Sequence, residues 1–405
     1  MPKLPPAHDS HAPIKVAFIV YGSIDQMSGG YLYDRRVVSA LRSRGDSVEV
    51  FGLSKLPYIL APFQGLGPML KTLFSGPGRR GGPSEGPSKY DCIVVDELVH
   101  PSVWLARFGR KARKDGIVTL VHHLRSQERI PAPGRAIARA FERVLLNRSS
   151  LIITTGAATA DKVRSLLTRY IPVLTCMPGR NSLPVPTGAS ARQTARKAGE
   201  PCRILSVGIL VPRKGYHRLV QALSSMKELP WECTIVGDDS IDPGYAARLR
   251  GLVERSGLGA LIRITGRLDD AELTKLYRNA HVFAFPSELE GYGIVLAEAM
   301  SFGIPYAAFR GGALPELIGR EEIFFSSPEG RIIRAEGGLV ADKPPAFAKA
   351  LKTLITDERL RRRFAGEAAN RALFFPTWDE TGRCFSDALL AAVRGAHGGR
   401  PGEGE

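Results

Sequence analysis

The chain has 405 residues, of which 44% are apolar and 24% are charged. This composition is ordinary for a folded globular protein and excludes collagen-like, disordered and disulfide-scaffold classes. The length favours two or three domains. No stretch approaches the roughly 20 apolar residues that a transmembrane helix needs, and no apolar segment typical of a signal peptide precedes the first strand.

The cysteine pattern indicates reduced thiols. The five cysteines are scattered, odd in number and never in a C-x-x-C pair. This pattern predicts neither a disulfide framework nor a zinc site. We therefore expect a cytoplasmic protein.

The positive charge is concentrated in the first half of the chain. Residues 1–200 contain 29 Lys and Arg against 14 Asp and Glu, whereas residues 201–405 contain 27 against 26. A basic half indicates an anionic partner, such as a nucleic acid, an acidic membrane surface or an acidic substrate, or only a basic solvated surface. No helix-turn-helix, RNP-like or zinc pattern is present, so we expect no nucleic-acid partner.

The first half alternates strands and helices. Its opening is a β-α-β unit, because a buried apolar strand is followed by a loop ending in Gly29 and Gly30, a helix and a second strand. Strands are predicted at 15–21, 47–51, 90–96, 116–121 and 151–154, and helices at 31–44 and 138–146. Residues 75–89 are rich in Gly, Pro and Ser and predict a surface insertion. The apolar stretch 57–74 before it is either core or a surface that touches a membrane.

The second half repeats the alternation after a polar linker at 187–201. Strands are predicted at 203–207, 233–236, 261–265, 282–285 and 304–308, and helices near 216–226, 244–256, 270–279, 293–302 and 346–356. The pattern predicts an α/β protein with two doubly wound, Rossmann-like domains facing across a cleft. The expected domains are 1–186 and 202–375, followed by a helix at 376–395 that packs towards the first domain and a disordered tail at 396–405.

Three loops of the second half follow predicted strands, where ligands bind in such folds. The first, Gly208 to Gly215, contains Lys214, a cation suited to a diphosphate beside a helix N-terminus. The second reads PSELEGYGIVLAEAM and places Glu290 and Glu298 eight residues apart. Glu298 falls in an apolar helix, where ribose hydroxyls would satisfy its carboxylate. The third, residues 310–316, also begins with glycines. Each loop also has a plainer interpretation. The first and third loops could be simple turns, and the glutamate of the second could be an exposed surface residue.

These residues carry a family resemblance. The segment PSELEGYGIVLAEAMSFGIPYAAFRGGALPEL resembles the donor-binding signature of the retaining GT-B glycosyltransferases of family 4. The likeness extends to SVGILVPRKGYHRLVQAL, IVGDD and TGRLDDAELTKLYRNAHVFAFPS, and is strong over about 202–320. In the first half it is weaker and covers Gly29-Gly30 and Val121-His122-His123-Leu124.

The resemblance implies a hexosyltransferase whose first domain binds the acceptor and whose second binds a nucleotide-sugar. Glu290, at the sugar ring, and His122, facing the sugar, are the catalytic residues that it implies. Lys214 would hold the phosphates, Glu298 the ribose and Arg267 would lie near the base. The full donor-binding set is Gly29, Gly30, Arg213, Lys214, Arg267, Gly291, Tyr292, Gly293, Ile294 and Glu298. Neither a metal nor a cofactor is expected.

One residue departs from the family pattern. Ile209 stands where these enzymes often have Arg, so one phosphate cation is missing unless Arg213 replaces it. An alternative function is therefore a catalytically inactive nucleotide-sugar-binding protein of the same fold. An oxidoreductase is less compatible, because the loop from Gly22 to Gly30 does not spell G-x-G-x-x-G.

The basic first half suggests the acceptor. It favours an anionic acceptor, or a glycan or lipid-linked acceptor in an acidic membrane, approached from the cytoplasmic face by a peripheral protein. The surface predicted to contact this membrane comprises residues 57–80 and 104–114, which mix aromatic and basic side chains.

Overall fold

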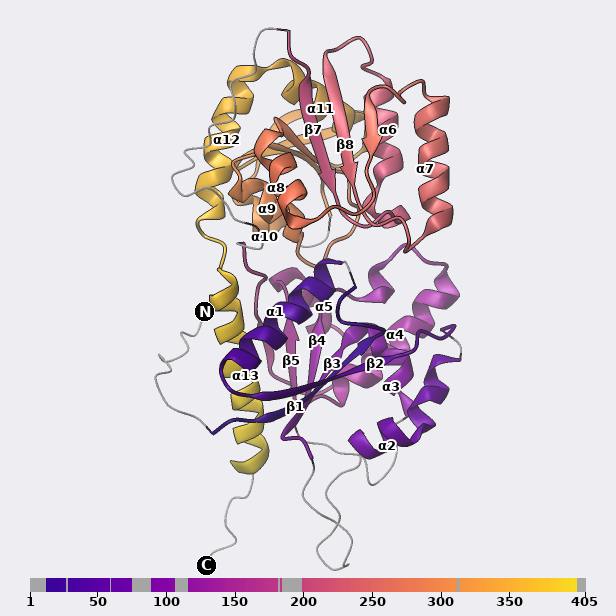
Figure 1. Cartoon of the computed structure of the whole chain (residues 1–405), viewed down its shortest axis with the longest axis vertical. Coiled ribbons are helices and arrows are strands. Elements are labelled where there is room, and N and C mark those ends of the chain that lie inside the picture. The colour runs from indigo at the N-terminus through magenta and orange to yellow at the C-terminus, as the bar shows by residue number, and fades with distance from the viewer. Residues whose placement is uncertain are drawn as a thin grey trace, which may run out of the picture.

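The structure, a computed structural model, describes residues 12–26, 28–58, 60–74, 89–105, 116–180, 183, 199–311 and 314–398. It forms two α/β domains stacked end to end, with the C-terminal helix running along the first (Figure 1). The predicted fold class, two doubly wound domains, is confirmed. The predicted linker and the insertion at 75–89 lie almost wholly outside the described residues, as does most of 104–114.

The first domain is built on a six-stranded parallel sheet of order β2-β1-β3-β4-β5-β6. Its central strands are buried apolar runs, as expected where helices cover both faces. The strands are β1 (Lys15–Tyr21), β2 (Ser47–Leu53), β3 (Cys92–Asp96), β4 (Ile117–Val121), β5 (Leu151–Thr154) and β6 (Val173–Thr175). The helices are α1 (Gly29–Ser43), α2 (Pro68–Phe74), α3 (His100–Val103), α4 (Ala132–Asn147) and α5 (Ala157–Arg164), with a 3₁₀ segment η1 (Ala61–Leu66) before α2.

The second domain has an eight-stranded sheet of order β12-β13-β14-β11-β10-β7-β8-β9. Its strands are β7 (Cys202–Val207), β8 (Trp231–Val236), β9 (Ile262–Ile264), β10 (Val282–Phe285), β11 (Tyr306–Phe309), β12 (Glu322–Ser327), β13 (Gly330–Ala335) and β14 (Gly338–Ala341). Its helices are α6 (Tyr216–Ser224), α7 (Pro243–Arg255), α8 (Asp270–Asn279), α9 (Ile294–Ser301), α10 (Leu314–Ile318), α11 (Pro344–Thr356) and α12 (Glu358–Ala372).

The alternation of strands and helices in the second half implies a parallel sheet, and this expectation is wrong at one edge of the sheet. β12, β13 and β14 pair antiparallel with one another, and only β14 joins β11 in parallel. Two residues connect β12 to β13, which is the length of a tight hairpin and too short for a helical crossover. These three strands do not alternate with helices, so the sequence pattern did not predict them.

Strand order positions the loops that carry chemistry. The direction of strand addition reverses between β1 and β3 in the first sheet and between β7 and β10 in the second. Loops leaving the carboxyl ends of adjacent strands at such a point diverge to opposite faces and leave a crevice. The loops after β7 and β10 are the ones that contain Lys214 and Glu290.

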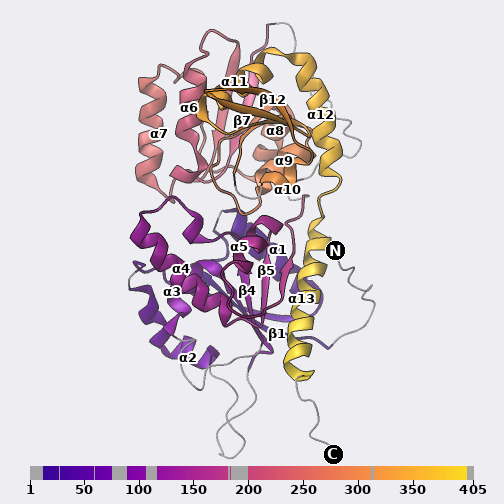
Figure 2. The same cartoon turned by 180° about the vertical axis from the view of Figure 1, so that it is seen from behind.

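Helix α13 (Trp378–Gly398) follows α12 at the end of the second domain and packs along α1 of the first (Figure 2). Gly382 allows this approach, because a Cβ there would lie 2.5 Å from the Cβ of Ala40. The helix begins near the expected position and runs three residues into the predicted tail. No helix in the described part of the chain is long and apolar enough to span a membrane.

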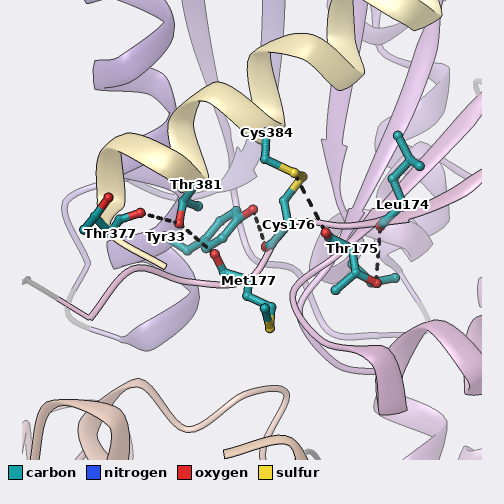
Figure 3. Close-up of a disulfide and its surroundings, with 9 residues drawn as sticks. Tyr33, Leu174, Thr175, Cys176, Met177, Thr377, Thr381 and Cys384 are labelled. Carbon is teal, nitrogen blue, oxygen red and sulfur yellow. Dashed lines mark hydrogen bonds between the residues drawn. A yellow bond between two sulfur atoms is a disulfide. The ribbon is translucent and has the colours of Figure 1, made fainter. Parts of the chain in front are cut away.

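A disulfide joins α13 to the first domain. Cys384 bonds to Cys176, which directly follows β6, across 208 residues of sequence (Figure 3). The hydroxyl of Thr381 also donates to the carbonyl of Met177 at 2.7 Å. The sequence-based expectation of no disulfide is therefore wrong for this pair, since spacing along the chain gave no sign that the two residues would meet. The other three cysteines, Cys92, Cys202 and Cys233, are buried.

Candidate functional site

A cavity of about 1200 Å³ lies between the carboxyl ends of the two sheets. It is lined by loops after β1, β3 and β4 of the first domain and by loops after β7, β8 and β10 of the second. All twelve predicted site residues line it: Gly29, Gly30, His122, Arg213, Lys214, Arg267, Glu290, Gly291, Tyr292, Gly293, Ile294 and Glu298. The structure therefore brings the predicted residues together, while their individual roles stay predictions.

An ion pair occupies the second-domain side of the cavity. The ammonium of Lys214 donates to Glu290 Oε1 at 2.5 Å, and the hydroxyl of Ser287 donates to the same atom at 2.5 Å. The side chains of Lys214 and Glu290 are only 13% and 11% exposed. Although burial disfavours the charged carboxylate, the nearby cations Lys214 and Arg213 hold the pKa of Glu290 below its usual range. The cavity wall therefore carries a buried ammonium paired with an ionised carboxylate.

Arg213 is positioned to replace the missing cation. Its guanidinium Nη1 lies 3.9 Å from Glu290 Oε2 and donates to the carbonyl of Leu289 at 3.3 Å. Ile209, the departure from the family pattern, also lines the cavity. The pair of Arg213 and Lys214 therefore supplies two cations on this side without a cation at position 209.

Glu298 is buried at the base of the cavity, on α9. Its side chain, 5% exposed, accepts a hydrogen bond from the hydroxyl of Tyr277 at 3.0 Å. The exposed-glutamate alternative is therefore wrong. Gly293 precedes α9 with a φ of 102°, a left-handed conformation that favours glycine and lets the loop turn sharply into the helix. Arg267 is exposed and sits at the rim of the cavity.

On the first-domain side, α1 directs its N-terminus at the cavity. Gly29 and Gly30 form its first turn, and the hydroxyl of Ser28 caps it by accepting from the backbone N–H of Tyr31 at 3.4 Å. A Cβ at Gly30 would lie 3.3 Å from the ring of His122. The glycine pair therefore allows backbone amides and the His122 ring to share a small space.

His122 is held by buried acidic residues. Its Nε2 lies 3.0 Å from Oδ1 of Asp34 and 3.6 Å from Oδ2 of Asp96. Burial works against the imidazolium, but Asp34 and Asp96 outweigh it and raise the pKa of His122 well above its usual value. Burial in turn raises the pKa of Asp34 to about 7. The predicted sugar-facing histidine thus lines the cavity with Nε2 turned towards carboxylates.

Sequence reasoning missed these acidic residues. Asp34 lies on the apolar stripe of α1, at the i, i+3, i+4 and i+7 spacing with Val37, Val38 and Leu41, so its burial could have been read from the pattern. Asp96 ends a wholly buried strand. A third carboxylate, Glu97, accepts from the backbone N–H of His122 at 2.9 Å.

The same cluster bears on the metal question. Ligand atoms of Asp34, Asp96 and His122 all lie within 4.8 Å of one another. One oxygen of Asp34 is buried without a hydrogen-bond partner among the described residues. The imidazolium already pairs with both carboxylates, however, and accounts for their proximity. Metal independence stays a prediction, to be tested directly.

Polar contacts join the two domains. Glu316 of α10 accepts hydrogen bonds from the backbone N–H groups of Ala157 and Ala158, at the start of α5, at 2.7 and 2.5 Å. Such a carboxylate satisfies helix donors that otherwise lack partners. Glu288 also pairs with Arg129 across the cleft at 3.1 Å.

Comparisons with known proteins show a similarity to glycosyltransferases. Residues 189–371 match the family model described as "Glycosyl transferases group 1". A D-inositol 3-phosphate glycosyltransferase of Xylanimonas cellulosilytica is 26% identical over 408 aligned residues, which cover 90% of this chain and 92% of that one. The protein of the same name from Arthrobacter sp. is 25% identical over 399 residues, covering 90% of each chain.

Solved structures share the whole architecture. Sucrose-phosphate synthase from Thermosynechococcus elongatus superposes with a TM-score of 0.70 at 19% identity, covering 94% of this chain and 100% of that one. Anabaena HepE, in complex with UDP and glucose, has a TM-score of 0.65 at 20% identity, covering 93% and 100%. At these identities the likeness shows the two-domain fold.

Proposed function

We propose that this chain is a group 1 glycosyltransferase with the GT-B fold, whose cleft moves a sugar from a nucleotide-sugar to a glycan or lipid-linked acceptor with retention of configuration. Family 4 membership is part of this proposal. The observation that carries it is the convergence of all predicted donor residues on one cavity. The solved relative with bound UDP and glucose supports a uridine nucleotide as the first donor to test.

We assign a role in this reaction to each of several side chains, guided by their positions in the cavity. Lys214 and Arg213 would meet the diphosphate and stabilise the negative charge that grows on it as the glycosidic bond breaks. Glu290 would then exchange its partner Lys214 for sugar hydroxyls, with Ser287 still holding one oxygen. Glu298 would accept from ribose hydroxyls. Positioning accounts for the remaining acceleration, because the cleft holds donor and acceptor against each other.

The acceptor is proposed from the relatives and from charge. The curated relatives are named for a phosphorylated acceptor, inositol 3-phosphate. The first domain of this chain is the basic half, and Arg125 and Lys55 line its side of the cavity. An anionic acceptor is therefore favoured. Cytoplasmic location is retained as a prediction.

The first experiment is a thermal-shift panel of UDP-, GDP-, ADP- and dTDP-sugars on the wild type and on Glu298→Ala. Ligands that bind only the native state raise the melting temperature by mass action. We expect one nucleotide class to stabilise the wild type and to lose most of that effect in Glu298→Ala. Tyr277→Phe is the matched control, because it removes the hydroxyl that contacts Glu298 and leaves the carboxylate in place.

Turnover decides between the enzyme and its inactive alternative. Release of the nucleoside diphosphate from the stabilising donor, with inositol 3-phosphate as acceptor, would support the transferase. If the protein binds the donor but transfers its sugar neither to an acceptor nor to water, the alternative of an inactive binding protein, which the residue Ile209 suggested, is favoured. The same assay with EDTA tests the metal prediction, and unchanged turnover is expected.

A further inference from the structure

The ring of His122 lies with one edge against helix α1. Its Nε2 is 3.0 Å from Oδ1 of Asp34, and a Cβ at Gly30 would lie 3.3 Å from its Cδ2. The ring of Tyr33 packs edge-to-face with it, at 5.4 Å between ring centroids. Because Cδ2 and Nε2 are neighbours in the imidazole, α1 covers this edge of the ring, and Nδ1 lies on the opposite edge.

Nδ1 is the polar atom of this ring that faces the cavity. The hydrogen bonds of His122 to other described residues use its backbone N–H, its carbonyl oxygen and Nε2, and none uses Nδ1. Nδ1 is also not among the buried polar atoms without a partner in this part of the chain. It is therefore accessible, and His122 lines the cavity. An oxygen of a bound ligand could meet Nδ1 there.

The charge of the ring decides what Nδ1 can do. A neutral imidazole with its proton on Nε2, towards Asp34, has a lone pair on Nδ1 and could accept a proton from a substrate. An imidazolium has protons on both nitrogens, so that Nδ1 can only donate a hydrogen bond. The groups around the ring therefore determine whether His122 is a base or a donor.

Three carboxyl groups surround His122. Those of Asp34 and Asp96 approach Nε2, at 3.0 and 3.6 Å, and that of Glu97 accepts from the backbone N–H at 2.9 Å. Although burial works against the imidazolium, Asp34 and Asp96 raise the pKa of His122 well above its usual value. The ring is thus positively charged at neutral pH, and Nδ1 carries a proton. Titratable side chains that line the cavity on α1, beside His122 and on the facing wall also include Tyr31, Tyr33, Arg35, His123, Lys214 and Glu290.

Asp34 occupies a position where an apolar side chain would be expected. It lies on the buried stripe of α1 with Val37, Val38 and Leu41 and is fully buried. Its Oδ1 bonds to His122, whereas Oδ2 has no hydrogen-bond partner among the described residues. A buried ion pair is often no more stabilising than apolar residues of the same size. Stability alone therefore does not account for this aspartate, whereas control of His122 does.

We propose that Asp34 is a positioning residue for the transfer reaction. It holds Nε2 of His122 and keeps the ring as an imidazolium, and Nδ1–H then donates a hydrogen bond to a hydroxyl oxygen of the donor sugar. Hydrogen bonds from a charged donor are about twice as strong as neutral ones, so the sugar is fixed beside the bond that breaks. His122 is not a general base in this arrangement. The contact with the sugar rests on the proposed function, whereas the charge and orientation of His122 do not.

The first test examines the wild type directly. NMR of the ring nitrogens in protein labelled with isotopic histidine reports which of them carry protons, and comparison with His122→Gln assigns the signals of His122. Near neutral pH, both nitrogens of His122 should be protonated in the ligand-free protein. Addition of UDP-glucose should shift the Nδ1 signal more than addition of UDP does, because the sugar supplies the acceptor oxygen.

The second test changes Asp34. With UDP-glucose as donor and inositol 3-phosphate as acceptor, Asp34→Asn should lower kcat/KM about 10- to 100-fold near neutral pH. The imidazolium is lost as pH rises through the pKa of His122, so activity should fall on the alkaline side. Because the variant lowers this pKa, its activity should fall at lower pH than that of the wild type, and its deficit should be smaller in acid.

Asp46→Asn is the matched control. Asp46 is also a buried aspartate of the first domain and pairs with Arg44 at 2.7 Å, but it does not line the cavity. Its replacement should lower the melting temperature and leave the ring nitrogens of His122 and the pH profile of kcat/KM unchanged. An Asp34 with only a structural role would behave in the same way.

Two results would overturn the proposal. One is a lone pair on Nδ1 in the wild type near neutral pH, and the other is an unchanged titration of His122 in Asp34→Asn. If that variant fails to fold, the wild-type spectrum still decides whether His122 is a donor. Absence of UDP-glucose binding and turnover in every protein would refute the proposed function, and the ligand-free spectrum would still confirm or refute the imidazolium.

Discussion

Gly291 of the second domain lies against the backbone carbonyl of His122 in the first. A Cβ at position 291 would sit 1.9 Å from that oxygen, which no side chain could tolerate without separating the domains. Gly291 follows β10 on one side of the cleft, and His122 follows β4 on the other side. Glycine at 291 therefore permits the closed arrangement in which both sides line one cavity.

Gly291→Ala should impair turnover through this contact. We expect kcat/KM to fall by about 10- to 100-fold, because small displacements of reacting groups are costly. The melting temperature should change little if the domains separate without unfolding. Gly366→Ala is the control, since a Cβ there meets nothing within 4 Å and alanine favours a helix. Full activity in Gly291→Ala would contradict the closed geometry.

Lys214→Met should reduce kcat more than it weakens donor binding. The lysine is proposed to stabilise charge that develops as the diphosphate leaves, so its loss should cost about 100- to 1000-fold. The methionine keeps most of the stem packing but leaves Glu290 with Arg213 as its remaining cation. Steady-state kinetics and donor titration measure the two effects. An increase in KM with an unchanged kcat would contradict this prediction, because Lys214 would then act only in binding.

Asp34→Asn should lower the pKa of His122, which NMR titration of the imidazole would report. In the wild type, Asp34 helps to raise that pKa. The imidazolium therefore contributes stability that is fully present below the unfolded pKa of about 6.5 and is lost as pH rises through the higher folded pKa. In the variant, this contribution should be smaller and its loss should be complete at a lower pH. An unchanged His122 titration would show that Asp96 or Glu97 suffices.

Removing the disulfide should loosen α13 from the first domain. Cys176→Ser with Cys384→Ser is expected to lower the free energy of unfolding by about 2–4 kcal/mol, the usual range for a disulfide. Denaturant unfolding with and without dithiothreitol measures it. Reductant should destabilise the wild type to a similar level and leave the double variant unaffected. If reductant leaves wild-type stability unchanged, the bond contributes nothing to folding.

The sequence determined the local elements and the positions of the loops. Apolar runs bounded by turns locate the parallel strands, and apolar residues at helical spacing locate α1 and α7. Each pattern can be recognised because the buried side chains of a strand or a helix recur in the order that its own geometry sets. The loops that hold Lys214 and Glu290 could be predicted for the same reason, since ligands of such sheets bind beyond the strand ends. Glu298 stood out as a carboxylate in an apolar helix.

Only the tertiary structure decided what those elements face. Strand order put the loops after β7 and β10 on either side of one crevice, and the contact of Gly291 with His122 depends on two separately folded sheets. Asp34 joins His122, and Cys176 joins Cys384, across distances in sequence that no local pattern encodes. Periodicity says that a side chain is apolar, and only packing determines whether Leu70 finds the core while Phe63 is left outside.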